Sequence, residues 1–253
     1  MRKCAFCPSN KLSKEHIWSD WINKCLPPTE YTFRRRDENG EYKYWQSSEL
    51  NFKARVVCKP CNNGWMSSLE VKEAKPSMGD MIRYGGAVSL LPRAIASISA
   101  FAFKTSVLSN HSGVYSHDPF FPVEQRYGFR NTLQVPKGVH VWMFAVRTPF
   151  GISGKLNSYF GRILDVEERF KIFVCTFSIG FLGLQLVATK WDDDSLISKP
   201  VPRVRQADTW NQIAVPLWPN DGTPVVWPPP KHISHYAVNE FCDRWKTNNF
   251  SNP

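Results

Sequence analysis

The residues best suited to chemistry lie in the first quarter of the chain. Two cysteine pairs, Cys4-x-x-Cys7 and Cys58-x-x-Cys61, offer four thiolates, which is the ligand set of a tetrahedral structural zinc ion. The 50 residues between the pairs are more than a compact zinc ribbon usually has, but a hairpin could bring the pairs together. The alternative is that one or both pairs are unrelated reduced thiols. We favour zinc because two such pairs rarely coincide by chance in one short polar segment.

Polar side chains that could act near a metal ion follow each cysteine pair. Glu15 and His16 come eight residues after the first pair, and Asn62 and Asn63 come directly after the second pair, at the start of an expected helix. Each has a structural alternative: Glu15 could sit in the first turn of a helix, where the dipole favours a carboxylate, and Asn62 could only cap a helix. The Glu-His pair alone favours the structural alternative, and the cysteine pairs reverse that preference.

Taken together, these motifs resemble those of the zinc-containing HNH (ββα-metal) endonucleases over about residues 1–75. The segments that carry the resemblance are Cys4-Ala-Phe-Cys7, Leu12-Ser-Lys-Glu15-His16-Ile17 and Val57-Cys58-Lys-Pro-Cys61-Asn62-Asn63-Gly64-Trp65. Two positions depart from the family pattern. Ser19 stands where many members have proline, and Asn51, the nearest match to the middle asparagine of the family, has a slightly long spacing.

The resemblance implies a role for each of these residues. His16 would be the general base that deprotonates a water, Glu15 and Asn62 would bind a catalytic Mg²⁺ or Mn²⁺, and Asn63 would help to orient the site. The four cysteines would hold a structural zinc ion that takes no part in the reaction. Glu70 lies two helical turns past Asn62 and is a further ligand or orienting residue, or equally a surface glutamate.

The charge of the chain fits a polyanionic partner. Lys and Arg number 32 against 22 Asp and Glu, a formal net charge of +10, and such a surplus can neutralise phosphates. Arg34, Arg35, Arg36, Lys53 and Arg55 give the first module a basic surface for a DNA backbone. The alternative is an ordinary solvated surface.

Hydrophobic periodicity and turn residues predict the elements of the first module. They are a helix over 14–25 capped by Ser13, a hairpin over 31–52 around the turn Asn39-Gly40, a strand over 53–57, and a helix over 62–75 that ends before Pro76.

Beyond a glycine-bearing link, Pro92 opens a helix to about residue 108 that is apolar almost all round and therefore buried. Its Lys104 is expected to snorkel to the surface. Strand-like runs follow at 139–147, at 171–189 with a break at 180–183, and at 210–218, before a last helix over 234–245. The predicted fold class is α+β: a zinc-stapled ββα-metal module (1–78), then an α+β domain with an antiparallel sheet (79–253), of unknown role in targeting, regulation or partner binding.

The sequence thus predicts a metal-dependent HNH endonuclease that hydrolyses DNA phosphodiester bonds, and family habit suggests restriction or anti-phage defence. The alternative is a zinc-dependent nucleic-acid-binding protein without catalysis; a weaker one is an interaction protein built on the β-rich half. No run approaches the ~20 apolar residues that span a bilayer, the odd count of seven cysteines argues against a disulfide framework, and we expect a cytoplasmic protein. The second domain could bind a protein partner or a second copy of the chain.

Overall fold

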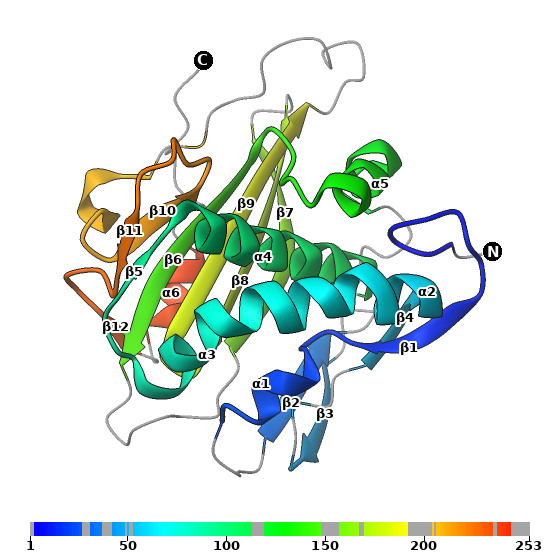
Figure 1. The fold of residues 1–253 in the computed structure, drawn as a ribbon, viewed down its shortest axis with the longest axis horizontal. Helices are drawn as coiled ribbons and strands as arrows, with labels where there is room; N and C mark the ends of the chain where they lie inside the picture. Colours follow the sequence, from blue (N-terminus) through cyan, green and yellow to red (C-terminus); the bar gives the residue numbers. More distant parts are fainter. Residues whose placement is uncertain are drawn as a thin grey trace.

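The structure is a computed structural model. It describes residues 3–26, 31–36, 42–48, 50, 53–112, 119–147, 157–166, 170–191, 204, 206–234 and 237–243. The chain has the predicted α+β fold class, with helices packed on antiparallel sheets (Figure 1). Within the described residues, no helix is both long and apolar enough to cross a membrane.

An antiparallel ribbon of two strands organises the N-terminal part. Strand β1 (Leu12–His16) pairs with β4 (Lys53–Cys58), so that Leu12 faces Cys58 and His16 faces Lys53. The strand predicted before Cys58 is therefore confirmed. Between these strands, β2 (Tyr31–Arg36) and β3 (Tyr42–Ser47) form the predicted hairpin. Its expected turn at Asn39-Gly40 lies outside the described residues.

The helix predicted over 14–25 is wrong for its first half, which is strand β1. Only the short helix α1 (Asp20–Asn23) is helical. Ser13 does not cap a helix; its hydroxyl donates to the carbonyl of Val57, 44 residues away in sequence, across the ribbon at 3.1 Å. Pairing with a distant strand has overridden a weak local preference.

A helical run follows β4 and, contrary to the prediction, does not stop before Pro76. It is kinked near its start at Gly64, whose φ of −94° and ψ of −111° are not helical. It consists of α2 (Lys59–Cys61), η1 (Asn62–Met66), η2 (Leu69–Ala74) and α3 (Lys75–Tyr84). The η2 segment is π-helical, and Pro76 is the second residue of α3, which directly follows it. The run ends at Gly85, which adopts the left-handed conformation with φ of 64°.

Helix α4 (Pro92–Ser112) is the central element, and its predicted burial is confirmed. It lies between the helical run on one side and the large sheet on the other (Figure 1). A helix covered on both sides must be apolar almost all round, which explains the composition of residues 95–108. Strand β5 (Val88–Leu90) leads into it, and α5 (Val123–Thr132) follows it.

The large sheet has six strands in the order β10-β6-β9-β8-β7, with β12 parallel to β6. The strands are β6 (Val139–Arg147), β7 (Asn157–Val166), β8 (Phe170–Ile179), β9 (Leu182–Trp191), β10 (Ala214–Trp218) and β12 (Ile233–Ser234). The runs predicted at 139–147 and 171–189 are thus confirmed, including the break between β8 and β9. The run predicted at 210–218 is a strand only from Ala214, and β7 was not predicted. Outside the sheet, η4 (Asp208–Trp210) precedes β10, and β11 (Val225–Trp227) pairs with β5. Helix α6 (Val238–Asp243) begins later than predicted, because Ser234 belongs to β12.

Alternation along β6 shows that the sheet is buried on both faces. Val141, Met143 and Ala145 join the core under α4, whereas Trp142, Phe144 and Val146 join a second core that includes Phe241 of α6. Helix α6 covers the face opposite α4 (Figure 1). The core under α4 is continuous from Cys4 to Trp227, and residue 78, the predicted domain boundary, lies inside α3.

Candidate metal centre and its surroundings

The four cysteines of the two pairs meet in one buried cluster. Cys4 and Cys7 precede β1, Cys58 ends β4 and Cys61 lies in α2, and their sulfur atoms all lie within 4.8 Å of one another. In a tetrahedral zinc–thiolate site the sulfurs are about 3.8 Å apart, because each Zn–S bond is about 2.3 Å. The donor type, number and spacing therefore fit, and the cluster could hold a metal ion such as zinc.

Backbone N–H groups around the cluster point at its sulfurs. The N–H groups of Phe6 and Cys58 donate to Cys4 Sγ at 3.5 and 3.3 Å. Burial raises the pKa of Cys4 to about 11, and it also raises the pKa of Cys61. Burial acts in the same direction on Cys58, but hydrogen bonds from Cys61 and the neighbouring thiols lower its pKa overall. Loading a cation would displace the thiol protons, so metal binding should weaken at low pH.

A second group of ionisable side chains is buried deeper in the fold. Lys104 of α4 is fully buried and forms an ion pair with Glu70 of η2. Glu15 of β1 is 6% exposed and interacts with both of them. Burial raises the pKa of Glu15 to about 7; the Lys104 ammonium opposes this shift and the Glu70 carboxylate adds to it.

The prediction that Lys104 snorkels to the surface is therefore wrong. The helical run and the sheet cover α4 from both sides and leave no route to water, so the ammonium is neutralised inside. Glu70, for which a surface position was equally open, is its partner. The sequence signal for a buried lysine was a single lysine in a helix that is apolar all round. Only the packing around α4 shows that this lysine is buried and does not reach the surface.

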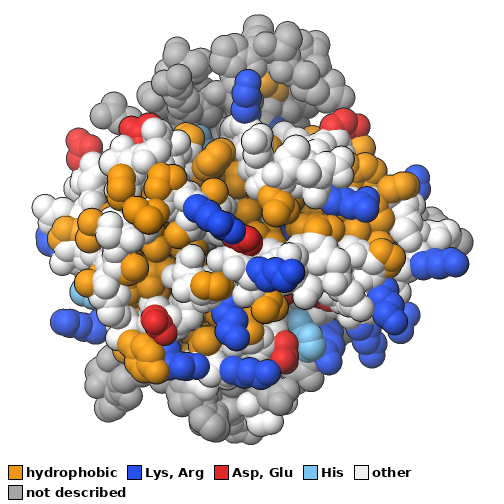
Figure 2. All heavy atoms as spheres, in the orientation of Figure 1, with side chains coloured by type: hydrophobic (Ala, Val, Ile, Leu, Met, Phe, Trp, Pro, Cys, Tyr) orange, Lys and Arg blue, Asp and Glu red, His pale blue; other side chains and the backbone are white. Residues whose placement is uncertain are grey.

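His16 lies at the open end of the ribbon. It is half-buried, next to the buried Glu15, as expected for neighbours that point to opposite faces of a strand. Its cross-strand partner Lys53 is exposed, and so is Arg55. Lys and Arg side chains gather at the edge of the molecule over β1, β4 and α2 (Figure 2); the exposed ones there are Lys11, Lys14, Lys53, Arg55 and Lys59.

The contacts of the described residues do not bring the other predicted site residues to Glu15. Asn62 is half-buried and Asn63 is exposed at the start of η1, beside Cys61 and therefore toward the Leu12 end of the ribbon. The side-chain contacts of the described residues link Glu15 with Glu70 and Lys104, and do not link it with Asn62 or Asn63. Arg34, Arg35 and Arg36 lie in β2, but their side chains are outside the described part, as is Asn51.

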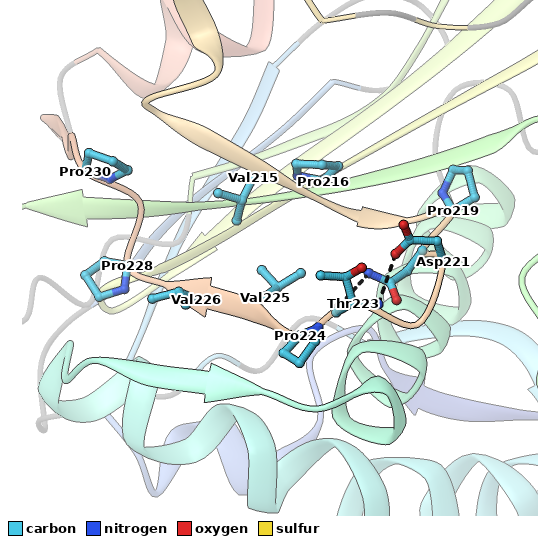
Figure 3. A pocket seen from close by; sticks show the side chains of 11 residues that line it. Val215, Pro216, Pro219, Asp221, Thr223, Pro224, Val225, Val226, Pro228 and Pro230 are labelled. Carbon is cyan, nitrogen blue, oxygen red and sulfur yellow. Dashed lines mark hydrogen bonds between the residues drawn. The ribbon is translucent and has the colours of Figure 1, made fainter.

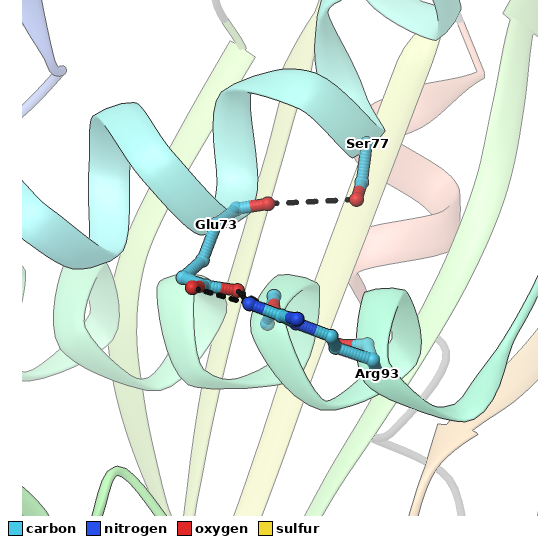
Figure 4. Close-up of polar contacts among 4 residues, drawn as sticks. Glu73, Ser77 and Arg93 are labelled. Carbon is cyan, nitrogen blue, oxygen red and sulfur yellow. Dashed lines mark hydrogen bonds and ion pairs between the residues drawn. The ribbon is translucent and has the colours of Figure 1, made fainter.

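Two further features lie apart from the cysteine cluster. A groove of about 780 Å³ between β10 and β11 is lined mostly by proline and valine, with Asp221 turned back onto the N–H of Thr223 (Figure 3). None of the predicted site residues lines it. At the start of α4, Arg93 reaches Glu73 of η2 at 3.0 Å, an exposed ion pair that ties the helical run to α4 (Figure 4).

The comparisons with known proteins add no relatives: no family model, no curated protein and no solved structure matches this chain.

Proposed function

We propose that the protein is a metal-dependent endonuclease of the HNH kind that hydrolyses DNA phosphodiester bonds. The observation that carries this proposal is the arrangement of the first ribbon, the helix that follows it and the cysteine cluster. Strand β4 of the two-stranded ribbon runs directly into the helical run, and the four-cysteine cluster lies where the two meet. His16 of the Glu-His motif ends β1, opposite the exposed Lys53. A role in restriction or anti-phage defence belongs to the same proposal.

In this proposal, His16 accepts the proton of the attacking water, and its half-exposed position leaves it open to a substrate. Mg²⁺ or Mn²⁺, when bound, would stabilise negative charge on the phosphate and the leaving oxygen. The family resemblance assigns Glu15 and Asn62 as its protein ligands and Asn63 as an orienting residue, although Asn62 and Asn63 lie toward the opposite end of the ribbon from His16. Glu15 must lose its proton to bind a cation, so activity should rise as the pH passes about 7.

Substrate binding would use the basic edge of the ribbon. Lys53 and Arg55 are exposed on β4, and Arg34, Arg35 and Arg36 of β2 extend the same proposal. These side chains would bind phosphates and would not read bases. Replacing any one of them with a neutral residue should therefore lower DNA affinity alike for all sequences and reduce the salt dependence of binding.

A zinc-dependent DNA-binding protein without catalysis is the second candidate. The observation that favours it is the burial of Glu15 against Lys104 and Glu70, because a carboxylate engaged there is less available to a catalytic cation. This candidate shares the basic edge and the cysteine cluster with the first, and differs in having no use for His16.

Nicking of supercoiled plasmid with Mg²⁺ or Mn²⁺ separates the two candidates. We expect the native chain to cut and His16→Ala to lose at least about 100-fold in rate, on the order expected for a general base, with its zinc content unchanged. The matched control is His232→Ala, an exposed histidine beside β12. DNA binding without cutting by the native chain would support the second candidate, and cutting that survives His16→Ala would refute the assigned base.

Lys53→Glu with Arg55→Glu tests the DNA surface, with the exposed Lys137→Glu and Lys231→Glu as a control of equal charge change. Binding is measured by fluorescence anisotropy over a range of salt concentrations. The ribbon variant should bind more weakly and with a shallower salt dependence than the control; equal losses of affinity in both would mean that only net charge matters.

A further inference from the structure

Arg126 of α5 is a buried cation whose place in the fold calls for an explanation. It is 9% exposed, and its guanidinium donates to two backbone carbonyls, that of Phe121 at 2.9 Å and that of Ala5. Ala5 lies inside the Cys4-x-x-Cys7 turn. Among the described residues Arg126 forms no ion pair with a carboxylate, and the interacting Glu124 is exposed.

A buried charge of this kind is costly unless an opposite charge lies close by. Four thiolates around a divalent ion carry a net charge of −2, and the cysteine cluster is as deeply buried as Arg126. Cys4 is one of the groups that interact electrostatically with the guanidinium. The positive guanidinium and the negative metal–thiolate centre would therefore neutralise each other.

An aromatic side chain of the same helix packs on residues next to the cysteines. Phe129, three residues after Arg126 on α5, packs on Phe6 and Trp65 with ring centroids 6.2 and 5.7 Å apart. Phe6 and Trp65 meet edge to face at 5.0 Å. The four cysteines are buried, which strengthens the charge interactions around them.

Trp65 offers a hydrogen-bond donor, its indole N–H, beside the cysteine cluster. Its indole N–H is buried and has no hydrogen-bond partner among the described residues, and it acts to lower the pKa of the nearby Cys61 thiol. A thiolate at Cys61 would give this N–H the acceptor it needs.

We propose that Arg126 is the counter-charge of a metal–tetrathiolate centre, and that α5 is the element that retains the metal. The metal site would then be completed by the second half of the chain, through contacts that hold the Cys4–Cys7 turn and neutralise its charge. Arg126 acts through the turn and is a positioning residue. The proposal requires metal binding by the four cysteines and is independent of nuclease activity.

The test uses the full-length protein loaded with Zn²⁺ and measures the rate of zinc transfer to a chromogenic chelator. The wild type should hold about one zinc ion per chain, since four cysteines make one site. Arg126→Gln should release it about 10- to 100-fold faster, the usual effect of losing an outer-shell partner of a metal site. Arg126→Lys, which keeps the charge but not both carbonyl contacts, should fall between. The control is Arg130→Gln, an exposed arginine one turn along α5, which should release zinc at the wild-type rate.

Melting temperatures with and without zinc separate a charge role from a purely structural one. If Arg126 balances the metal centre, Arg126→Gln should lower the melting temperature of the zinc-loaded protein more than that of the zinc-free protein. Equal lowering in both forms, or unfolding of the variant regardless of zinc, would overturn the proposal. So would release of zinc at the wild-type rate, and so would a wild type that binds no zinc. Nuclease activity enters none of these measurements, so its absence would count only against the proposed function.

Discussion

Three ionisable side chains, Glu15, Glu70 and Lys104, come from β1, η2 and α4 and meet inside the molecule. Below the pKa of Glu15 the group is neutral overall, with one ammonium, one carboxylate and one protonated acid; above it the net charge is −1. The interactions among these three side chains connect β1, which carries His16, to α4 at the centre of the fold. Their contribution to stability depends on pH.

The stability of the protein should fall as the pH rises from about 4.5 to about 7. Folded Glu15 holds its proton up to a pKa of about 7, against an ordinary value of 4.5, so the folded state binds more protons than the unfolded chain in this window. The free energy of unfolding should drop across it by at most about 3 kcal/mol from this group. Denaturant unfolding at several pH values, without added Mg²⁺ or Mn²⁺, measures the effect.

Glu15→Gln isolates the contribution of this carboxyl group, because glutamine cannot ionise. Its free energy of unfolding should rise relative to the wild type as the pH increases from about 4.5 to about 7. Glu124→Gln, an exposed position, should run parallel to the wild type. Parallel curves for Glu15→Gln as well would show that Glu15 titrates normally.

Lys104→Met should destabilise the fold by about 3–5 kcal/mol, because it leaves the buried Glu70 without its cation. The double variant Lys104→Met with Glu70→Gln should recover much of that loss, which a double-mutant cycle quantifies. Arg93→Met, which breaks the exposed pair with Glu73, should change stability little. A snorkelling lysine would instead give Lys104→Met and Arg93→Met equally small effects.

Among the elements, the turn between β8 and β9 fixes how the large sheet meets the helical run. The N–H of Phe181 donates to the carbonyl of Ile82 in α3 at 3.2 Å, and Gly180 beside it adopts a φ of 55°. A Cβ atom at Gly180 would lie 2.2 Å from the same carbonyl oxygen. Only glycine allows the turn to approach the helix so closely.

Gly180→Ala should therefore lower the free energy of unfolding by about 2–4 kcal/mol, from the left-handed conformation and the clash together. Gly128→Ala is the matched control, because a Cβ at that exposed position of α5 meets nothing within 4 Å. It should leave stability unchanged or raise it by up to about 1 kcal/mol. Similar values for the two variants would mean that the turn can move away from α3.

For the whole molecule, the main consequence is that one core joins the cysteine cluster to the large sheet. Met78, Met81 and Ile82 of α3 and the Glu70 carboxylate all face partners that come later in the chain. Arg126 and Phe129 then return from α5 to the first cysteine pair. The part of the chain that carries the cysteine cluster is therefore packed into a larger unit.

A chain of residues 1–78 should consequently fail to fold cooperatively, even with one equivalent of Zn²⁺. It would expose the apolar face of its helix and leave Glu70 without Lys104. Circular dichroism during heating tests this against the full-length protein, which should melt cooperatively and at a lower temperature once a chelator has removed the metal. A cooperative melt of the fragment would show that the module is an independent domain.

The sequence alone determined the features that depend on local spacing. The cysteine pairs predicted the buried four-cysteine cluster, the all-round apolar pattern predicted the buried α4, and strand-like runs predicted β6, β8, β9 and β10. Each of these patterns is visible in short stretches of the sequence. The extended conformation of β1, the helical run through Pro76, the burial of Lys104 against Glu70 and Glu15, and the contact of Arg126 with the first cysteine turn depended on the tertiary structure. Their partners lie from 34 to 121 residues away where hydrogen bonds join them. Local preference at these positions is worth a fraction of a kcal/mol, whereas strand pairing, burial and charge neutralisation across the fold are worth several, so the distant contacts decide.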